Sequence, residues 1–529
     1  MGFVSYYFII FLAVAFLLYW VTPKKYRYIS LLVVSLVFYG WISWKSLFFI
    51  ATSTTSMYFF ARFIQKKNEE QKAYFEANKE TLSKEEKKAY KAKNKRQRKA
   101  ALVFGILINV IILAVMKYLD FALGSIFSFI RLFDSGVSTP RLNLFLPLGI
   151  SFYTFQAIAY LVDTYWGKIE AEKNFLKFSL FMCFFPKVMQ GPIVRYQEMK
   201  EALFGEHALT YDLVTRSLVR LMWGYFKKLV IADTMAVFVT FAFQNTGVLS
   251  GSEAFIAILF YFIQDYCDFS GYMDIAIGVS GLFGVALPEN FNHPYFALTI
   301  DDYWRRWHMT LGAWFKDYVF YPLSVSRFSL ALGRGSKKVF KNFGKKIPAV
   351  FGLIVVWLLT GLWHGASWHY VLWGLYYGLI IVLSIIFEPA FRKFHEITHI
   401  KEDSLGWKIF RHIRTIFILL VGRLIFIAPT LNDAWVVFLK MWRLDEFDQS
   451  NLMSQIGYVS AIAAFVCAIA VFVVDLIQEC RPGTSFIDKM NKLPLWARWS
   501  FYIGTILLIV WLGFYGSGLP RSEFGYVQF

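Results

Sequence analysis

One histidine lies inside the apolar part of the sequence, where an ionisable side chain is costly. His364 stands in the run 361–368, GLWHGASW, at the junction of two apolar segments. Enclosure by apolar and small residues penalises the charged imidazole, and the neutral imidazole is the form that a general base requires. We therefore predict a catalytic role for His364, with structural hydrogen bonding as the alternative. Gly361 and Gly365 permit the close approach of a neighbouring helix or a ligand.

A second polar cluster runs from Pro288 to a second histidine, and its last part has helical spacing. Two acids each stand four residues before an arginine, a spacing that predicts ion pairs along a helix: Asp301 with Arg305 and Asp302 with Arg306. Four further residues recur at i, i+3, i+4 and i+7 and should share one helix face: Trp304, Trp307, His308 and Leu311. The cluster predicts a helix that neutralises its own charges and presents His308 among aromatic rings. A membrane-interface helix with an aromatic belt is the alternative.

Two other patterns contain residue types that could take part in catalysis or metal binding. Acids interrupt an otherwise apolar stretch between Gln264 and Asp274, which marks a third polar cluster at membrane depth. The run 395–399, HEITH, matches the HExxH pattern of zinc hydrolases. Its basic flanks and the lack of an obvious third ligand argue against zinc, and we predict an amphipathic connector and no metal site.

The composition defines the class of protein that must position these residues. The chain has 529 residues, of which 57% are hydrophobic and 17% charged, whereas soluble domains carry about 25% charged residues. Apolar runs of about 20 residues recur, the length needed to cross a bilayer. A soluble enzyme, a disordered chain and a secreted disulfide scaffold are excluded, and the four cysteines predict small buried thiols.

The net charge of +19 is concentrated in two segments. Residues 62–99 contain 14 Lys and Arg against 6 Glu, and residues 327–346 contain 7 Lys and Arg with no acid. Between membrane spans, such segments are typical of cytoplasmic loops near anionic lipid headgroups, and we expect no nucleic-acid partner. Counting spans between the basic clusters then places the N-terminus outside the cell.

The pattern of apolar runs predicts an all-α, polytopic membrane protein, because backbone polar groups in lipid must be satisfied within each segment. We expect about 11–13 helical elements at membrane depth, some of them short or re-entrant. The predicted organisation is N-terminal membrane helices at 1–61, a basic cytoplasmic loop at 62–99, a core at 100–390 that holds the three polar clusters, a connector with a further helix at 391–455, and C-terminal membrane helices at 456–529. No convincing internal repeat is visible, which weakens a transporter built from inverted repeats.

Several short motifs together resemble the membrane-bound O-acyltransferase family, in its bacterial polysaccharide O-acetylase branch. They are LPLGISF at 146–152, QGPI at 190–193, DFSGY at 268–272, NFNHPY at 290–295, WRRWH at 304–308 and LWHGASW at 362–368. The aromatic ending FGYVQF at 524–529 is similar to that branch as well. The resemblance covers about residues 100–390 and implies a ring of helices around a central tunnel.

The resemblance also implies a function and roles for individual residues. His364 matches the catalytic histidine and His308 the second histidine of the family. The tunnel or substrate path would be lined by Trp304, Trp307, Trp363, Asn290, Asn292 and His293, while the charge pairs Asp301–Arg305 and Asp302–Arg306 would be structural, near the donor side.

The implied reaction is O-acetylation of an exported or cell-wall polysaccharide in the cytoplasmic membrane. The donor would be a cytoplasmic thioester such as acetyl-CoA, with no bound cofactor, and an extracytoplasmic SGNH-type protein would be the partner. The open alternatives are D-alanyl transfer to teichoic acid from a carrier-protein thioester, and a transporter or flippase without catalysis.

Overall fold

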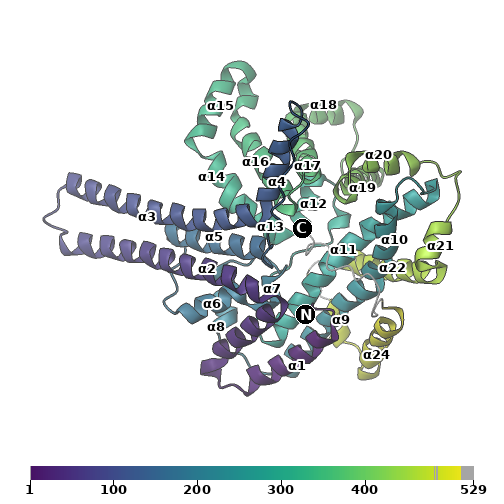
Figure 1. The fold of residues 1–529 in the computed structure, drawn as a ribbon, viewed down its shortest axis with the longest axis horizontal. Helices are drawn as coiled ribbons and strands as arrows, with labels where there is room; N and C mark the ends of the chain where they lie inside the picture. The colour runs from purple at the N-terminus through teal and green to yellow at the C-terminus, as the bar shows by residue number, and fades with distance from the viewer. Residues whose placement is uncertain (1, 482, 484–485, 514–529) are drawn as a thin grey trace. The chain divides into compact units, whose positions relative to one another are not determined.

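The computed structural model describes residues 2–481, 483 and 486–513, and its regular elements in that part of the chain are helices (Figure 1). The one extended pairing among these residues is an isolated antiparallel bridge between Phe291 and Trp307. The terminal FGYVQF motif lies outside the described residues. The all-α prediction is confirmed.

Six helical segments of the described chain are long and apolar enough to cross a membrane. A span of about 20 apolar residues is needed for a hydrocarbon core about 30 Å thick. The segments are Lys24–Ala77, Lys84–Ile130, Ile347–His364, Trp368–Ile386, Tyr458–Cys480 and Leu495–Leu512. The chain therefore has the helices of a multi-pass membrane protein.

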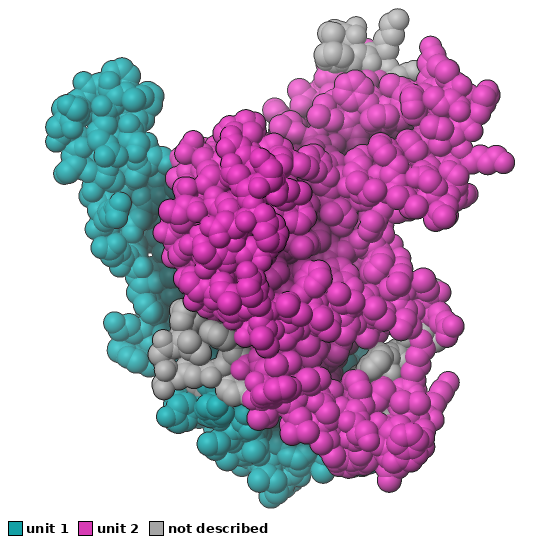
Figure 2. Space-filling view, turned by 90° about the vertical axis from the view of Figure 1, so that its right-hand side faces the viewer, with its two compact units in different colours: residues 1–214, 279–287 teal, residues 215–278, 288–529 magenta. Residues whose placement is uncertain are grey.

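The chain divides into two compact units, which Figure 2 colours separately. The first unit comprises residues 1–214 and 279–287. Its helices are α1 (Tyr6–Val21), α2 (Arg27–Ala77), α3 (Lys84–Leu113), α4 (Leu119–Ile130), α5 (Ile150–Trp166), α6 (Phe175–Cys183), α7 (Phe185–Val188) and α8 (Tyr196–Phe204). A buried hydrogen bond from Ser53 to Asn109 at 2.5 Å joins α2 to α3.

The basic segment 62–99, expected to be a loop, is helical on both sides of a short turn and forms an arm of α2 and α3 (Figure 1). Ser83 and Glu86 form a capping box that starts α3. Across the arm, the rings of Tyr74 and Tyr90 stack at 4.2 Å. The high charge of this segment suggested a loop, but charge does not determine conformation. Interspersed Glu and Lys residues are good helix formers, so the same composition is compatible with a helix. The basic segment 327–346 is likewise largely helical.

The second unit comprises residues 215–278 and 288–529. Its helices begin with most of α9 (Tyr211–Tyr225), then α10 (Asp233–Gln244), α11 (Gly251–Leu282), α12 (Ile300–Arg306), α13 (Met309–Phe315), α14 (Tyr321–Ser324), α15 (Arg327–Phe340), α16 (Ile347–His364) and α17 (Trp368–Ile386). They continue with α18 (Glu388–Thr398), α19 (Leu405–Ile427), α20 (Leu431–Lys440), α21 (Ser450–Ile456), α22 (Tyr458–Cys480), α23 (Phe486–Asn491) and α24 (Leu495–Leu512).

Helices α16 and α17 approach each other through glycines. A Cβ on Gly361 would stand 2.3 Å from the carbonyl oxygen of Tyr370, and a Cβ on Gly374 would stand 2.3 Å from that of Trp357. Real Cβ atoms do not approach so closely, so each position requires glycine. The expectation that Gly361 permits close helix packing is confirmed.

Candidate functional site

The segment around His308 is built from two chain stretches that run antiparallel. The backbone N–H of Asn292 donates to the carbonyl of Arg306 at 2.9 Å, and that of Met309 donates to Asn290 at 3.0 Å. We call residues 290–293 together with 306–310 the histidine hairpin. It places His308 in the left-handed region, with φ of 49°.

This arrangement corrects one sequence prediction. We expected one helix face to carry Trp304, Trp307, His308 and Leu311, but α12 ends at Arg306 and α13 begins at Met309. Trp307 is extended, and it forms the bridge with Phe291. The helix breaks because the 290–292 stretch supplies alternative backbone hydrogen-bond partners, which the periodicity of 301–311 does not reveal.

Asn290 is the hydrogen-bonding centre of the histidine hairpin. Its side-chain Oδ1 accepts from the backbone N–H of Thr310 at 3.0 Å and from the Thr310 hydroxyl at 2.9 Å. The same oxygen lies 3.3 Å from Nδ1 of His308. Asn290 is fully buried and His308 is 3% exposed, so this network fixes the imidazole inside the protein.

His364 is the last residue of α16, where the helix gives way to the extended Gly365. Its imidazole is 3% exposed. The rings of Trp363, Trp373 and Phe426 surround it at centroid distances of 5.0, 4.8 and 5.3 Å. The sequence prediction of a buried histidine among apolar and small residues is confirmed.

The indole of Trp363 lies beside both histidines. Its ring centroid is 5.6 Å from that of His308 and 5.0 Å from that of His364. The ring of Phe269 closes the other side of His308 at 4.8 Å. The structure therefore brings together the two histidines that the sequence analysis singled out, although 55 positions separate them in the chain.

Both predicted ion pairs of α12 are present. Arg305 contacts Asp301 at 2.6 Å, and Arg306 contacts Asp302 at 3.0 Å. The first pair is exposed, and exposed pairs contribute roughly 0–1 kcal/mol. Burial opposes the charge of Arg306, but hydrogen bonds to Glu479 and Asp302 outweigh it and raise the pKa of this guanidinium.

Two of the predicted lining residues, Trp304 and Trp307, pack within aromatic clusters. The Trp304 ring meets those of Trp357, Trp373 and Tyr377 edge to face, at centroid distances of 5.0, 5.5 and 4.9 Å. Trp307 is buried, and the guanidinium of Arg423 lies 4.4 Å from its ring centroid. Each of the two adjoins a ring that contacts a histidine: Trp304 meets Trp373 beside His364, and Trp307 meets Phe269 beside His308.

Sequence reasoning missed two contributors from α19. Arg423 is 2% exposed and is held by Asp265 at 2.5 Å and by the hydroxyl of Tyr303 at 2.8 Å. Phe426 packs against His364. An arginine inside the apolar stretch 409–428 was the available signal for Arg423, since such a charge needs a buried partner.

Two acids of the third polar cluster, between Gln264 and Asp274, pair with lysines on the π-helical turn at 226–232. The ammonium of Lys228 is fully buried between Asp268 at 2.5 Å and Asp233 at 2.7 Å. Lys227 pairs with Asp274 and donates to Ser270 at 2.9 Å. The acids predicted at membrane depth are thus compensated by lysines, as buried charges require.

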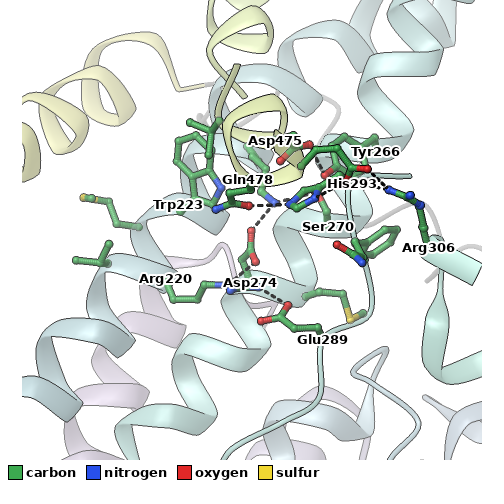
Figure 3. Close-up of a pocket in the computed structure, with 18 of the residues that line it drawn as sticks. Arg220, Trp223, Tyr266, Ser270, Asp274, Glu289, His293, Arg306, Asp475 and Gln478 are labelled. Carbon is green, nitrogen blue, oxygen red and sulfur yellow. Dashed lines mark hydrogen bonds and ion pairs between the residues drawn. The ribbon is translucent and has the colours of Figure 1, made fainter. Parts of the chain in front are cut away.

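A cavity of about 750 Å³ lies against the histidine hairpin (Figure 3). Asn292 and His293 line it, whereas Asn290, Trp304, Trp307 and Trp363 are not among its described lining residues. Ion-paired side chains dominate the lining, with Arg220 donating to Asp274 and to Glu289 at 2.6 Å each. The predicted lining set is therefore divided between a solvent-reachable cavity and the buried wall.

The HExxH pattern does not lie on one helix. Helix α18 ends at Thr398, and His399 adopts a left-handed backbone with φ of 51°. Over the described residues, no cluster of three or more His, Cys, Asp or Glu side chains is placed to hold a metal ion.

This architecture, apolar helices around two buried histidines, defines a multi-pass membrane protein with an enclosed site. A family model described as MBOAT, membrane-bound O-acyltransferase family, matches residues 170–334. The chain is 31% identical over 458 residues to the probable alginate O-acetylase AlgI of Pseudomonas aeruginosa, covering 85% of this chain and 77% of the relative.

Two further relatives are named for other activities. The peptidoglycan O-acetyltransferase of Helicobacter pylori is 38% identical over 320 residues, covering 56% of this chain and 57% of the relative. The teichoic acid D-alanyltransferase of Bacillus subtilis is 30% identical over 263 residues, covering 48% of this chain and 63% of the relative. The chain belongs to the membrane-bound O-acyltransferase family and is an acyltransferase.

Proposed function

We propose that the protein transfers an acetyl group from a cytoplasmic thioester, acetyl-CoA, for O-acetylation of an exported or cell-wall polysaccharide. The observation that carries the proposal is the pair of buried histidines that both lie beside Trp363. The choice of acetyl over D-alanyl is supported by how much of this chain each relative covers. The alginate O-acetylase aligns over 85% of the chain, and the D-alanyltransferase over 48%.

His364 acts as the general base in the proposed reaction. Its neutral imidazole takes the proton of an acceptor hydroxyl while the hydroxyl oxygen attacks the thioester carbonyl. The tetrahedral intermediate then breaks its carbon–sulfur bond. His364 gives the proton to the leaving thiolate, so that CoA leaves as the free thiol and the imidazole is neutral again. Proton transfer of this kind contributes about 10²–10⁴-fold to the rate. The acetyl group moves directly, because the sequence lacks the GxSxG elbow of a serine nucleophile.

The cavity beside the histidine hairpin is the proposed donor vestibule. Its arginines and lysine are each matched by a carboxylate: Arg220 with Asp274 and Glu289, Lys227 with Asp274, and Arg306 with Glu479. A lining with balanced charge suits the uncharged pantetheine arm of a thioester better than its phosphates, which would need additional cations. A volume of about 750 Å³ is of the size of a ligand site.

The acceptor side completes the proposal. An extracytoplasmic SGNH-type protein receives the acetyl group and passes it to the polysaccharide, or the polysaccharide accepts it directly. The protein resides in the cell membrane with its N-terminus outside. D-alanyl transfer from a carrier-protein thioester to teichoic acid is the second candidate, supported by the D-alanyltransferase relatives.

The test is acetyl transfer by the purified protein in lipid nanodiscs, measured as CoA release and as acetyl content of the polymer. We expect His364→Ala to lower the rate at least 10²-fold, as for loss of a general base, and His308→Ala to cause a severe loss as well. His395→Ala is the matched control, since this histidine lies outside the site. Wild-type acetylation by His364→Ala would refute the assignment, and activity only with D-alanyl carrier protein would select the second candidate.

A further inference from the structure

Helix α22 carries two charged residues, and both lie on one face near its C-terminal end. Asp475 and Glu479 are four positions apart, with Gln478 beside them, so the three side chains share a helix face. All three line the cavity beside the histidine hairpin, where Figure 3 shows Asp475 and Gln478 close to His293. Charged groups in a helix that is otherwise apolar are costly and call for a role.

Glu479 joins the two strands of the histidine hairpin at the end away from His308. Each of its carboxylate oxygens accepts from Nη1 of Arg306 at 2.8 Å. Its Oε2 also lies 3.3 Å from Nδ1 of His293, while Oε1 of Gln478 lies 2.8 Å from Nε2 of the same ring. One residue of α22 therefore holds both Arg306 and His293, which belong to opposite strands of the hairpin.

The hairpin needs such support because its backbone is strained. His293 and His308 have φ of 43° and 49°, and they are two of the four non-glycine residues in the described chain with positive φ. Left-handed backbone is unfavourable for a non-glycine residue and persists only where the surroundings enforce it. Asn290 restrains the end next to His308, and Glu479 restrains the opposite end.

Asp475, on the same face of α22, holds the neighbouring ring of Tyr266. Its carboxylate accepts from the hydroxyl of Tyr266 at 2.6 Å. The Tyr266 ring in turn lies 5.9 Å from that of Phe291 and 6.2 Å from that of Trp307, the two bridged residues of the hairpin. The polar face of α22 thus contacts the hairpin directly and through α11.

We propose that Glu479 is a positioning residue for acyl transfer, which keeps His308 in place through Arg306 and His293 without touching the reacting groups. Helix α22 lies beyond the segment 170–334 that the family model matches and beyond the catalytic core predicted at 100–390. The inference rests on the proposed function, in which His308 is needed for transfer and acetyl-CoA is the donor.

The experiment compares Glu479→Gln, Glu479→Asp and wild type for acetyl transfer in nanodiscs. Glu479→Gln keeps the size but loses the ion pair, and we expect kcat to fall roughly 10–100-fold, as expected when catalytic groups shift by a fraction of an ångström to 1 Å. KM for acetyl-CoA should stay within about twofold, because glutamine keeps the shape of the donor vestibule that Glu479 lines. Glu479→Asp keeps the charge and should recover most of the activity. Glu388→Gln is the control, since this exposed carboxylate also bridges two cations, Lys346 and Arg392.

A double-variant comparison separates positioning from general destabilisation. If Glu479 acts through Arg306, then Arg306→Gln and the Glu479→Gln/Arg306→Gln pair should have similar kcat, because the second change removes nothing further. Additive losses, unchanged kcat in Glu479→Gln, or a rise in KM alone would each overturn the proposal.

Folding is checked by size-exclusion profile and melting temperature. If Glu479→Gln fails to fold, Arg306→Gln decides the matter, since removal of the other partner of the same ion pair should lower kcat by a similar factor, and a wild-type kcat in that variant would overturn the proposal. A wild-type protein inactive with acetyl-CoA would count against the proposed donor, and the same variants would then be compared with the thioester that wild type uses.

Discussion

Asn290 determines the proton position on the His308 ring. Its Oδ1 accepts from the Thr310 backbone N–H, a group that can only donate, so the oxygen assignment of the amide is fixed. Nδ1 of His308 must then carry the proton that it shares with this oxygen at 3.3 Å. A neutral His308 therefore has its lone pair on Nε2, and this nitrogen would accept a hydrogen bond rather than donate one to an oxyanion.

Replacing Asn290 by aspartate tests this arrangement. A carboxylate beside the ring stabilises the imidazolium and raises the pKa of a histidine by about 1–3 units. We expect turnover to need the neutral His308 ring with its lone pair on Nε2, so the acidic limb of the kcat profile should move to higher pH in Asn290→Asp. The measurement is kcat between pH 5 and 9, with Asn245→Asp as a control at an exposed helix end. An unchanged acidic limb would show that the charge state of His308 does not matter for turnover.

The helices show which parts of the fold could be predicted from the sequence. Hydropathy identified the α16–α17 pair and His364 at its junction, since apolar length alone predicts membrane helices. Local spacing correctly predicted the pairs Asp301–Arg305 and Asp302–Arg306. The break at 307–308 was not predictable, because the helix competes there with backbone partners from 290–292, a segment remote in sequence.

The close packing of α16 on α17 leads to a prediction at the scale of these elements. In Gly361→Ala the new Cβ would meet the Tyr370 carbonyl oxygen at 2.3 Å, so the helices must separate. Overpacking of this kind costs about 1–3 kcal/mol, and the shift would displace His364 from its aromatic surroundings. We expect a lower melting temperature in detergent together with loss of transfer activity.

Gly504→Ala is the control for this substitution. Gly504 also lies inside a helix, α24, but nothing stands within 4 Å of its Cβ position. Alanine there should leave the melting temperature unchanged or raise it, since alanine favours helix by about 1 kcal/mol over glycine. If both variants melted alike, close packing at Gly361 would not be important for stability.

Across the whole molecule, the site residues come from distant parts of one chain but from a single compact unit. His308, His364, Arg423 and Glu479 all belong to the second unit. The predicted core at 100–390 contains the two histidines, and the contributions of α19 and α22 emerged only from the three-dimensional contacts. Contacts between residues more than 100 positions apart leave no periodic pattern in a single sequence. The available sign of them is a charged residue within an apolar run, which needs a partner elsewhere in the chain.

The distribution of charge leads to a prediction about the orientation of the whole chain. The arm of α2 and α3 carries a surplus of eight positive charges over residues 62–99, and segments of this kind remain in the cytoplasm. The next span, Lys84–Ile130, then ends outside the cell, so the exposed residues that follow it should be extracellular. We therefore expect Ser138→Cys to react with a membrane-impermeant maleimide in intact cells, and Glu80→Cys to react only after permeabilisation.

The labelling is done in a background where Cys480 is serine, because it is the exposed native cysteine among the described residues. The two test positions are both exposed in the structure, so a difference in reactivity reports the side of the membrane and not burial. Labelling of Glu80→Cys in intact cells would show that the orientation of the chain is the reverse of the predicted one. The proposed orientation, with the basic arm in the cytoplasm and the N-terminus outside, would then have to be abandoned.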